Sequence, residues 1–478
     1  MNGYRGPTVQ AVIVAVLGIQ ACGGPHSQDP VEELALPDTV TFADHVASIV
    51  RAKCMPCHRP GQIGPFPLIT YTDVRRKAKT VRFMTGHRYM PPWPADTAYT
   101  RFLGERVLSA RQIALILRWV DTGALPGDTA NLPPPPPHLD EPPLGKPDLV
   151  VWMPDTMHVP GDARDLFMIA KAPFEIQRDT FVRDIVFVPG NRALVHHMNG
   201  GLVNYAAGAK HDVFAGHGYI DASVMKGVDA FTALQLANDD GTWPALTPSA
   251  VNYLPGMLPP MYPEGIGGYH LKRKGAILLN TLHFGPAPHD TIDRSRFLVY
   301  YAAGPPERPL KELSMGSLGV APVHPSLHLD PGQVATFHSQ YRLRTAISVL
   351  SVNPHMHLLG RKFLAYAVTE IGDTIPLVRI NDWDFRWQFV YTFPHIVVLP
   401  KGATIHVYGT FDNTAESPQQ PFDPPREVIG SDSPFMRTTD EMLQFFITYI
   451  DHQEGDERIN LAPDVSGGAS APVAAASR

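Results

Sequence analysis

Most of this 478-residue chain carries a β-strand pattern, and that pattern restricts its fold more than any other feature. From residue 146 to about 453, short apolar runs rich in Val, Ile, Phe, Tyr and Thr alternate with Gly, Pro, Asn and Asp turns. Proline, with 49 residues, favours turns and strand edges. About 300 residues of this kind are too many for one sandwich, so we predict two all-β, jelly-roll-type sandwiches meeting near Pro305-Pro306. The clearest expected strands are 181–188, 276–284, 346–352 and 445–450.

The first 22 residues indicate export. Arg5 precedes an apolar stretch from Ala11 to Ile19 that is shorter than the ~20 residues of a membrane span and is typical of a signal peptide. The next residues, Ile19-Gln20-Ala21-Cys22-Gly23, resemble the lipobox of bacterial lipoproteins, which implies that Cys22 becomes the lipidated N-terminus and a membrane anchor. The alternative is plain secretion with an incidental cysteine. Both predict a location in the bacterial periplasm or cell envelope.

The motif Cys54-Met55-Pro56-Cys57-His58 is the c-type haem attachment pattern. Each thiol can add across a haem vinyl group, and His58 then places its imidazole on the iron. The alternatives are a redox dithiol or half of a zinc site. With three cysteines in the chain, however, no second pair completes a zinc cluster. We therefore predict one covalently bound haem c.

The residues around this motif predict helices. Apolar side chains recur at helical spacing over 42–53, directly before the motif. A second helix should start at Ser109, which begins a capping-box pattern, and should stop at Gly123. Two helices flanking a haem motif resemble a small cytochrome c. The resemblance implies a sixth iron ligand, which we place at Met90, with Met84 and His87 as the alternatives.

Histidines form three groups in the β-rich part. His196 and His197 are adjacent, His283 ends an apolar run, and His355 and His357 are two residues apart. On a strand, residues two apart point to one face and can share a metal. Adjacent histidines can do so only if the strand ends or bulges there, or if the rings use different nitrogens. Taken singly, each histidine is more often structural or at the surface.

The order of these groups is more specific than any one of them. Together with Thr439-Asp440-Glu441-Met442, it resembles the copper type II, ascorbate-dependent monooxygenases, the family of peptidylglycine α-hydroxylating monooxygenase and dopamine β-monooxygenase. The resemblance covers roughly residues 180–450. It includes Leu254-Pro255-Gly256, Tyr262-Pro263-Glu264-Gly265, Asp293-Arg294-Ser295, Leu399-Pro400-Lys401-Gly402 and Phe411-Asp412-Asn413.

The resemblance implies two copper ions. One would be held by His196, His197 and His283, and would store an electron and deliver it across an interdomain cleft. The other would be held by His355, His357 and Met442, the catalytic set at which O2 is activated and a C–H bond is broken. A thioether among imidazoles suits Cu(I). Taken alone, Met442 would be a core residue of a strand over 442–450.

Departures from the family limit the substrate. Peptide-amidating relatives have an arginine, an asparagine and a tyrosine where this chain has Asn353, Gln444 and Phe446. The arginine that would clamp a peptide carboxylate is missing, which argues against peptide amidation. The animal enzymes are also rich in disulfides, whereas the three cysteines here are assigned to haem and lipid.

We therefore expect a copper-dependent monooxygenase that hydroxylates a small organic substrate with O2. Electrons would come through the haem from an external one-electron donor, either an ascorbate-like reductant or a periplasmic redox protein. The alternatives are a haem and copper electron-transfer or copper-binding protein, and a carbohydrate- or protein-binding jelly roll with an appended cytochrome. The net charge of −6 provides no basic footprint for nucleic acid.

The expected organisation has seven parts. A run of five prolines from Pro133 to Pro137 makes a semi-rigid spacer between the haem domain and the sandwiches. The parts are a signal peptide (1–21), a linker (22–37), the cytochrome c-like domain (38–128), the Pro-rich linker (129–145), the two sandwiches (146–306 and 307–453) and a disordered tail (454–478).

Overall fold

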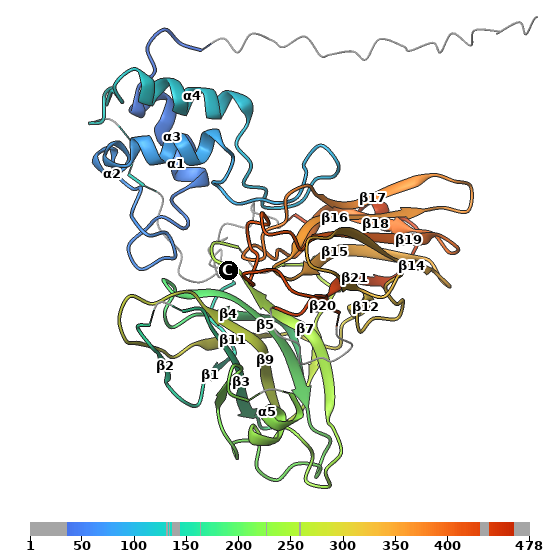
Figure 1. Cartoon of the computed structure of the whole chain (residues 1–478). Coiled ribbons are helices and arrows are strands. Elements are labelled where there is room, and N and C mark those ends of the chain that lie inside the picture. Colours follow the sequence, from blue (N-terminus) through green and yellow to red (C-terminus); the bar gives the residue numbers. More distant parts are fainter. Residues whose placement is uncertain are drawn as a thin grey trace, which may run out of the picture.

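The computed structural model describes residues 36–130, 132, 134–135, 144–162, 164–225, 227–257, 260–430 and 439–462. The signal peptide, Cys22, most of the proline-rich linker and residues 463–478 lie outside the described residues. The prediction of a disordered tail from residue 454 is wrong for 454–462, because Asp456 pairs with Arg308 at 2.6 Å and Leu461 is completely buried. The described part is mostly β-sheet, as predicted, with a helical region at its N-terminal end (Figure 1). Within it, no helix is both long enough and apolar enough to span a membrane.

The helical region surrounds the cysteine motif. The predicted helix over 42–53 forms, with a π-helical first turn, and ends where the motif starts. The predicted capping box is confirmed, because Ser109 Oγ accepts the Gln112 N–H at 3.1 Å and Gln112 accepts the Ser109 N–H at 2.9 Å. The fully buried Trp119 packs in the core of this region. The elements are η1 (Phe42–Val46), α1 (Ala47–Lys53), α2 (Tyr71–Arg76), α3 (Ala78–Gly86) and α4 (Ala110–Asp121).

The first sandwich consists of two antiparallel sheets, ordered β1-β11-β4-β8 and β6-β3-β9-β5-β7. Phe187 and Phe297 from one sheet and Leu279 and Phe284 from the other share one core. Its elements are β1 (Leu149–Trp152), β2 (Met157–Val159), β3 (Leu166–Glu175), β4 (Thr180–Val188), β5 (Val195–Asn204), β6 (Tyr219–Asp221), α5 (Gly227–Ala233), β7 (Ala245–Tyr253), β8 (Tyr269–Leu271), β9 (Lys274–Phe284), β10 (Thr291–Asp293) and β11 (Arg296–Tyr301).

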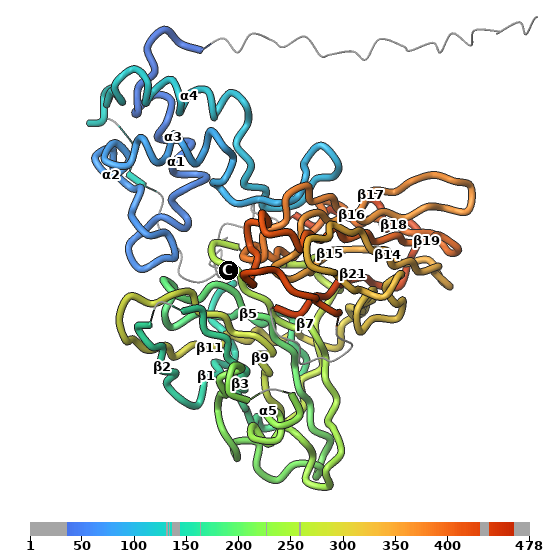
Figure 2. Tube along the Cα trace, in the orientation of Figure 1, coloured from blue at the N-terminus to red at the C-terminus, as the bar shows by residue number. Residues whose placement is uncertain are grey.

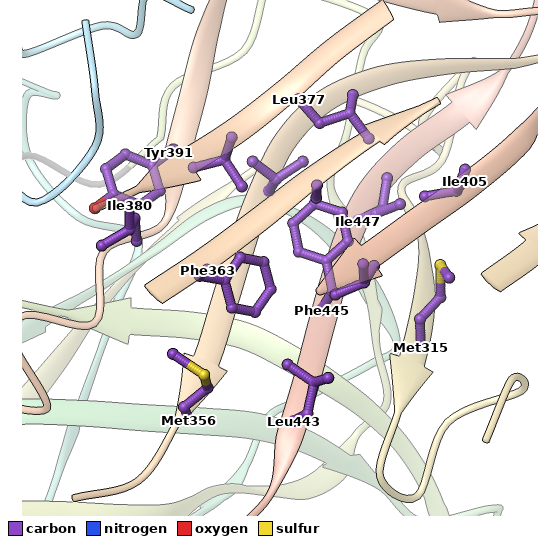
Figure 3. Packing of buried hydrophobic residues seen from close by; sticks show 14 of the residues in the cluster. Met315, Met356, Phe363, Leu377, Ile380, Tyr391, Ile405, Leu443, Phe445 and Ile447 are labelled. Carbon is purple, nitrogen blue, oxygen red and sulfur yellow. The ribbon is translucent and has the colours of Figure 1, made fainter. Parts of the chain in front are cut away.

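The second sandwich packs a sheet of order β12-β21-β15-β18 on one of order β14-β19-β16-β17. Figure 3 shows Met356, Leu443 and Phe445 from the first of these sheets beside Phe363 and Ile405 from the other. Its elements are β12 (Lys311–Gly316), β13 (His328–Leu329), β14 (Val334–Arg342), β15 (Ile347–Met356), β16 (Gly360–Val368), β17 (Thr374–Ile380), β18 (Tyr391–Leu399), β19 (Thr404–Asp412), β20 (Val428–Ile429), β21 (Leu443–Asp451) and η2 (Asp456–Arg458).

Residues 93–103, between α3 and α4, lie on the second sandwich (Figure 2). Ala95 and Phe102 are buried in its core, and the Asp96 N–H donates to the Arg379 carbonyl at 2.8 Å. The Asp96 carboxylate also pairs with the Arg379 guanidinium at 2.8 Å. From the sequence we expected this segment inside a separate domain. It packs on the sandwich instead, which provides the apolar core that buries Ala95 and Phe102.

Candidate metal centres

A β-bulge brings the three histidines of the first sandwich together. The pairing of β5 with β9 shifts between Val195 and His197, so His196 is the extra residue of the bulge, and His197 lies directly opposite His283. The nearest ring nitrogens of the three residues all lie within 4.8 Å of one another. Of the alternatives left open by the sequence, a strand end, a bulge or the use of different ring nitrogens, the structure has the bulge.

Asp165 orients this cluster from the loop before β3. The His283 Nε2–H donates to Asp165 Oδ1 at 2.6 Å, which leaves the His283 Nδ1 lone pair directed at His197 Nδ1, 3.2 Å away. On the other side, the Phe167 ring stacks on His283 with the ring centroids 4.3 Å apart. A carboxylate behind a ligating imidazole fixes both its tautomer and its orientation.

The three-histidine cluster fits a bound metal ion. Burial, then the neighbouring His283, lowers the pKa of His196 to about 4, and burial with the nearby histidines holds the pKa of His197 well below its usual range. Both rings are therefore neutral at physiological pH, the form that binds metals. The Nδ1 atom of His196 is buried and has no hydrogen-bond partner among the described residues, so a metal ion would satisfy it.

Replacing Asp165 with asparagine should weaken metal binding at this cluster. Without the carboxylate, the His283 tautomer is no longer fixed, and loss of such a partner typically lowers affinity roughly 10–100-fold. Competition titration with a copper chelator measures the change. Asp162→Asn is the matched control, because Asp162 pairs with Arg164 in the same loop. Equal affinity in both variants would remove Asp165 from this role.

The second cluster lies at the end of β15. The rings of His355 and His357 have centroids 5.1 Å apart and are nearly perpendicular. Nδ1 of His355 bonds to Gln388 Oε1, and Nδ1 of His357 bonds to the Asp440 carbonyl at 2.7 Å. Nε2 is therefore the metal-binding atom that these bonds leave on each ring. Burial, then the charge of His357, lowers the pKa of His355 to about 3, so this imidazole is also neutral.

The register of β15 and β21 predicts where Met442 lies relative to these two histidines. His355 pairs with Gln444 and Met356 pairs with Leu443, so continuing the register places Met442 opposite His357. Leu443 and Met356 point into the core (Figure 3), and side chains alternate along a strand. Met442 is only 6% exposed, yet it is not part of the core cluster that contains Leu443. The extended register therefore predicts that the Met442 thioether faces the same side of the sheet as the two imidazoles.

Glu441 holds the backbone of this second cluster. It is buried, and its carboxyl group accepts the N–H groups of His357 at 3.0 Å and Leu359 at 2.6 Å. Burial raises its pKa to about 8, although these hydrogen bonds act in the opposite direction. Sequence reasoning noted Glu441 within a motif but gave it no role, because its partners are visible only once β15 and β21 are paired.

The loop between β17 and β18 contacts both clusters. The Phe385 ring centroid lies 6.4 Å from that of His197 and 5.8 Å from that of His357. A single aromatic ring therefore contacts a histidine of each cluster. Trp387 lies 5.6 Å from His196, and Gln388 binds His355. Sequence reasoning missed all three residues. The available signal was a loop that contains two of the six tryptophans of the chain, Trp383 and Trp387.

The cysteine motif forms a turn at the end of α1. The N–H groups of Cys57 and His58 both donate to the Cys54 carbonyl, and neither Cys54 nor Cys57 is in a disulfide. Burial, then the Cys57 charge, raises the pKa of the Cys54 thiol to about 12. Nδ1 of His58 bonds to the Phe66 carbonyl at 3.0 Å, which leaves Nε2 for the iron.

Two buried polar atoms, one on the helix before the motif and one shortly after Met90, agree with a bound haem. Nε of Arg51, on α1, and Nε1 of Trp93, three residues after Met90, have no hydrogen-bond partner among the described residues. Buried donors are normally satisfied, and haem carries two carboxylates that accept hydrogen bonds. The donor set and the two thiols therefore fit a covalently held haem.

The candidates for the sixth iron ligand differ in exposure. His87 is exposed; its ring stacks on Tyr89 and contacts Phe83, with centroid distances of 5.7 and 4.2 Å. Met84 and Met90 are half-buried, and the Met90 N–H donates to the Met84 carbonyl at 3.2 Å. Exposure therefore favours the two methionines over His87.

The cysteine motif also contacts the first sandwich. Arg106 Nη1 lies 3.6 Å from Cys57 Sγ, and the Pro255 carbonyl lies 3.9 Å from it. Gly256 has a φ of +73°, and a Cβ there would lie 2.8 Å from Cys57 Sγ. Glycine is thus required both by its conformation and by this close approach. The loop Leu254-Pro255-Gly256, noted in the sequence for its resemblance, is a contact between the two regions.

No profile of a known protein family matches the chain, and no curated protein is significantly similar to it.

Proposed function

We propose that this chain is a copper-dependent monooxygenase that hydroxylates a C–H bond of a small organic substrate with O2 and receives electrons through a fused c-type haem. The observation that carries the proposal is the pairing of two different ligand sets. One is all imidazole, with a buried His196 Nδ1 that has no partner among the described residues. The other consists of His355 and His357, to which we assign the Met442 thioether by continuing the register of β15 and β21. A copper ion that stores an electron and a copper ion that reacts with O2 need different ligands.

The residues of the chain have separate roles in this proposal. His196, His197 and His283 hold one copper, while His355, His357 and Met442 hold the other, which is the catalytic one. Asp165, Gln388 and the Asp440 carbonyl fix the tautomers of His283, His355 and His357. The Phe385 ring contacts both His197 and His357 and so keeps water out of the space between them. Bound copper would supply one-electron transfer and O2 activation.

A haem held by Cys54, Cys57 and His58, with Met90 as the sixth ligand, supplies electrons in this proposal. Monooxygenation consumes two electrons beyond those of the substrate, and two coppers that each store one meet that need. An external one-electron donor then reloads the haem. Export and lipidation at Cys22 also belong to the proposal, and both place the enzyme at the bacterial cell envelope.

The proposal is tested on the full chain, made in a host that matures c-type cytochromes and then loaded with copper. We expect two coppers per chain, a haem stain that survives denaturing electrophoresis, and labelled oxygen from O2 in the product of at least one C–H substrate. The haem stain should weaken in Cys57→Ala. A two-copper protein that incorporates no label across a broad substrate panel would favour the electron-transfer alternative, and absence of copper would favour the binding jelly roll.

A further inference from the structure

A row of aromatic rings leads from the segment after Met90 to the three-histidine cluster. The Trp93 centroid lies 5.2 Å from that of Phe389. Phe389 lies 6.1 Å from Trp387, and the two rings are nearly parallel, at 16°. Trp387 in turn lies 5.6 Å from His196. Residues of three separate parts of the chain thus form one continuous set of ring contacts.

The first ring of this row is fixed by the surface on which its segment packs. Two residues after Trp93, Ala95 is buried and forms a β-bridge with Ile380. Asp96 then binds Arg379 through both backbone and side chain, as described above. Six residues farther on, Phe102 enters the core of the second sandwich. The Trp93 ring is therefore held against the sandwich along a stretch of chain, rather than touching it at one point.

The other two rings are fixed within the β17–β18 loop. Phe389 is only 1% exposed, and its carbonyl accepts the Asn353 side-chain N–H at 2.8 Å. The Trp387 N–H donates to the Asp384 carbonyl at 2.9 Å, in a turn that the Asp384–Arg386 ion pair stabilises. These contacts hold Phe389 and Trp387 in place independently of any bound metal.

The bulge in β5 explains why the row ends at His196. The His196 ring is nearly perpendicular to that of His197, at 86°, and lies against Trp387. In a regular strand, adjacent side chains point to opposite faces of the sheet. The extra residue therefore lets His196 join the cluster while its ring also contacts the opposite sandwich.

We infer that Trp93, Phe389 and Trp387 are the route by which an electron passes from the haem to the copper at His196. The inference rests on the proposed function. In this step ferrous haem becomes ferric and Cu(II) becomes Cu(I). One electron moves, no bond breaks and no proton is transferred. The external donor then returns the haem to the ferrous state. The rings act as positioning and coupling groups, because closely packed π-systems replace longer through-space steps.

The test measures electron transfer in the absence of O2 and substrate, so that its readout is not turnover. Full-length protein with ferric haem and two Cu(II) receives one electron per chain, and rapid-mixing absorbance follows haem reoxidation. The Cu(II) electron paramagnetic resonance signal of rapidly frozen samples reports copper reduction. In Trp387→Leu we expect the transfer to slow by at least an order of magnitude, with the haem spectrum unchanged. Trp387→Phe, which keeps a ring, should restore most of the rate.

Two further variants keep the test decisive. Phe389→Leu interrupts the row without touching a copper ligand, so a slower rate there cannot result from copper loss. Phe102→Leu changes a ring of the segment that carries Trp93. The ring contacts of Phe102 are with Tyr391 and Phe393 and not with Trp93, Phe389 or Trp387, so this variant should transfer the electron at the wild-type rate. If wild type transfers the electron and Phe389→Leu does so equally fast, the route is overturned while the proposed function stands. If wild type binds no copper or no haem, both are overturned.

Discussion

Met442→His should retain both coppers and lose oxygen-dependent hydroxylation down to background. The thioether lies on the same face as His355 and His357, and a soft sulfur ligand favours Cu(I), the state needed to react with O2. A third imidazole would still bind the ion but would favour Cu(II). Copper content by elemental analysis, together with incorporation of labelled oxygen from O2, measures the two effects separately.

Met356 provides a matched control on the neighbouring strand. It lies between the two histidines in sequence but is completely buried and points into the core (Figure 3). Met356→Leu should cost less than about 1.5 kcal/mol and keep hydroxylation, because the exchange nearly conserves volume. Met442→Leu, the same change on the other face, should abolish hydroxylation. Normal turnover in Met442→His would show that the oxygen site lies elsewhere.

Glu441→Gln should destabilise the metal-free chain and weaken copper binding at His355 and His357. The carboxyl group accepts the backbone N–H groups of His357 and Leu359, one on each oxygen. A glutamine amide has only one accepting oxygen, so one buried N–H loses its partner, at a cost of about 1–3 kcal/mol. The chain turn that carries His357 then shifts, and the ring with it.

The effect of Glu441→Gln is measured by thermal unfolding without metal, because bound copper would itself add stability. Copper affinity is then measured by chelator competition on the folded protein. Glu416→Gln is the control, since Glu416 is exposed and undergoes the same exchange of a carboxyl group for an amide. An unfolding midpoint equal to that of the control would mean that Glu441 does not support the His357 turn.

Local sequence patterns predicted the elements on which the candidate site is built. The helical spacing of apolar residues over 42–53 and the Ser109 capping box depend on contacts within a few residues, so they are readable from the chain. The strand predicted over 346–352 also forms, and it extends as β15 to Met356, so that it carries His355. The period of two in a strand also made a bulge at His196 one of the three alternatives, and the structure has it.

The tertiary structure alone decided which groups surround these histidines. Asp165 reaches His283 because β3 pairs with β9, and Phe385, Trp387 and Gln388 reach the clusters because the β17–β18 loop packs there. A loop sequence has no period from which these directions can be inferred. The position of 93–103 on the second sandwich was equally hidden. Its apolar residues indicate that the segment is buried, but they do not indicate which part of the chain covers it. The sequence thus determined the ligand-bearing strands by itself, whereas long-range packing decided the partners of the ligands and the row of rings between the two regions.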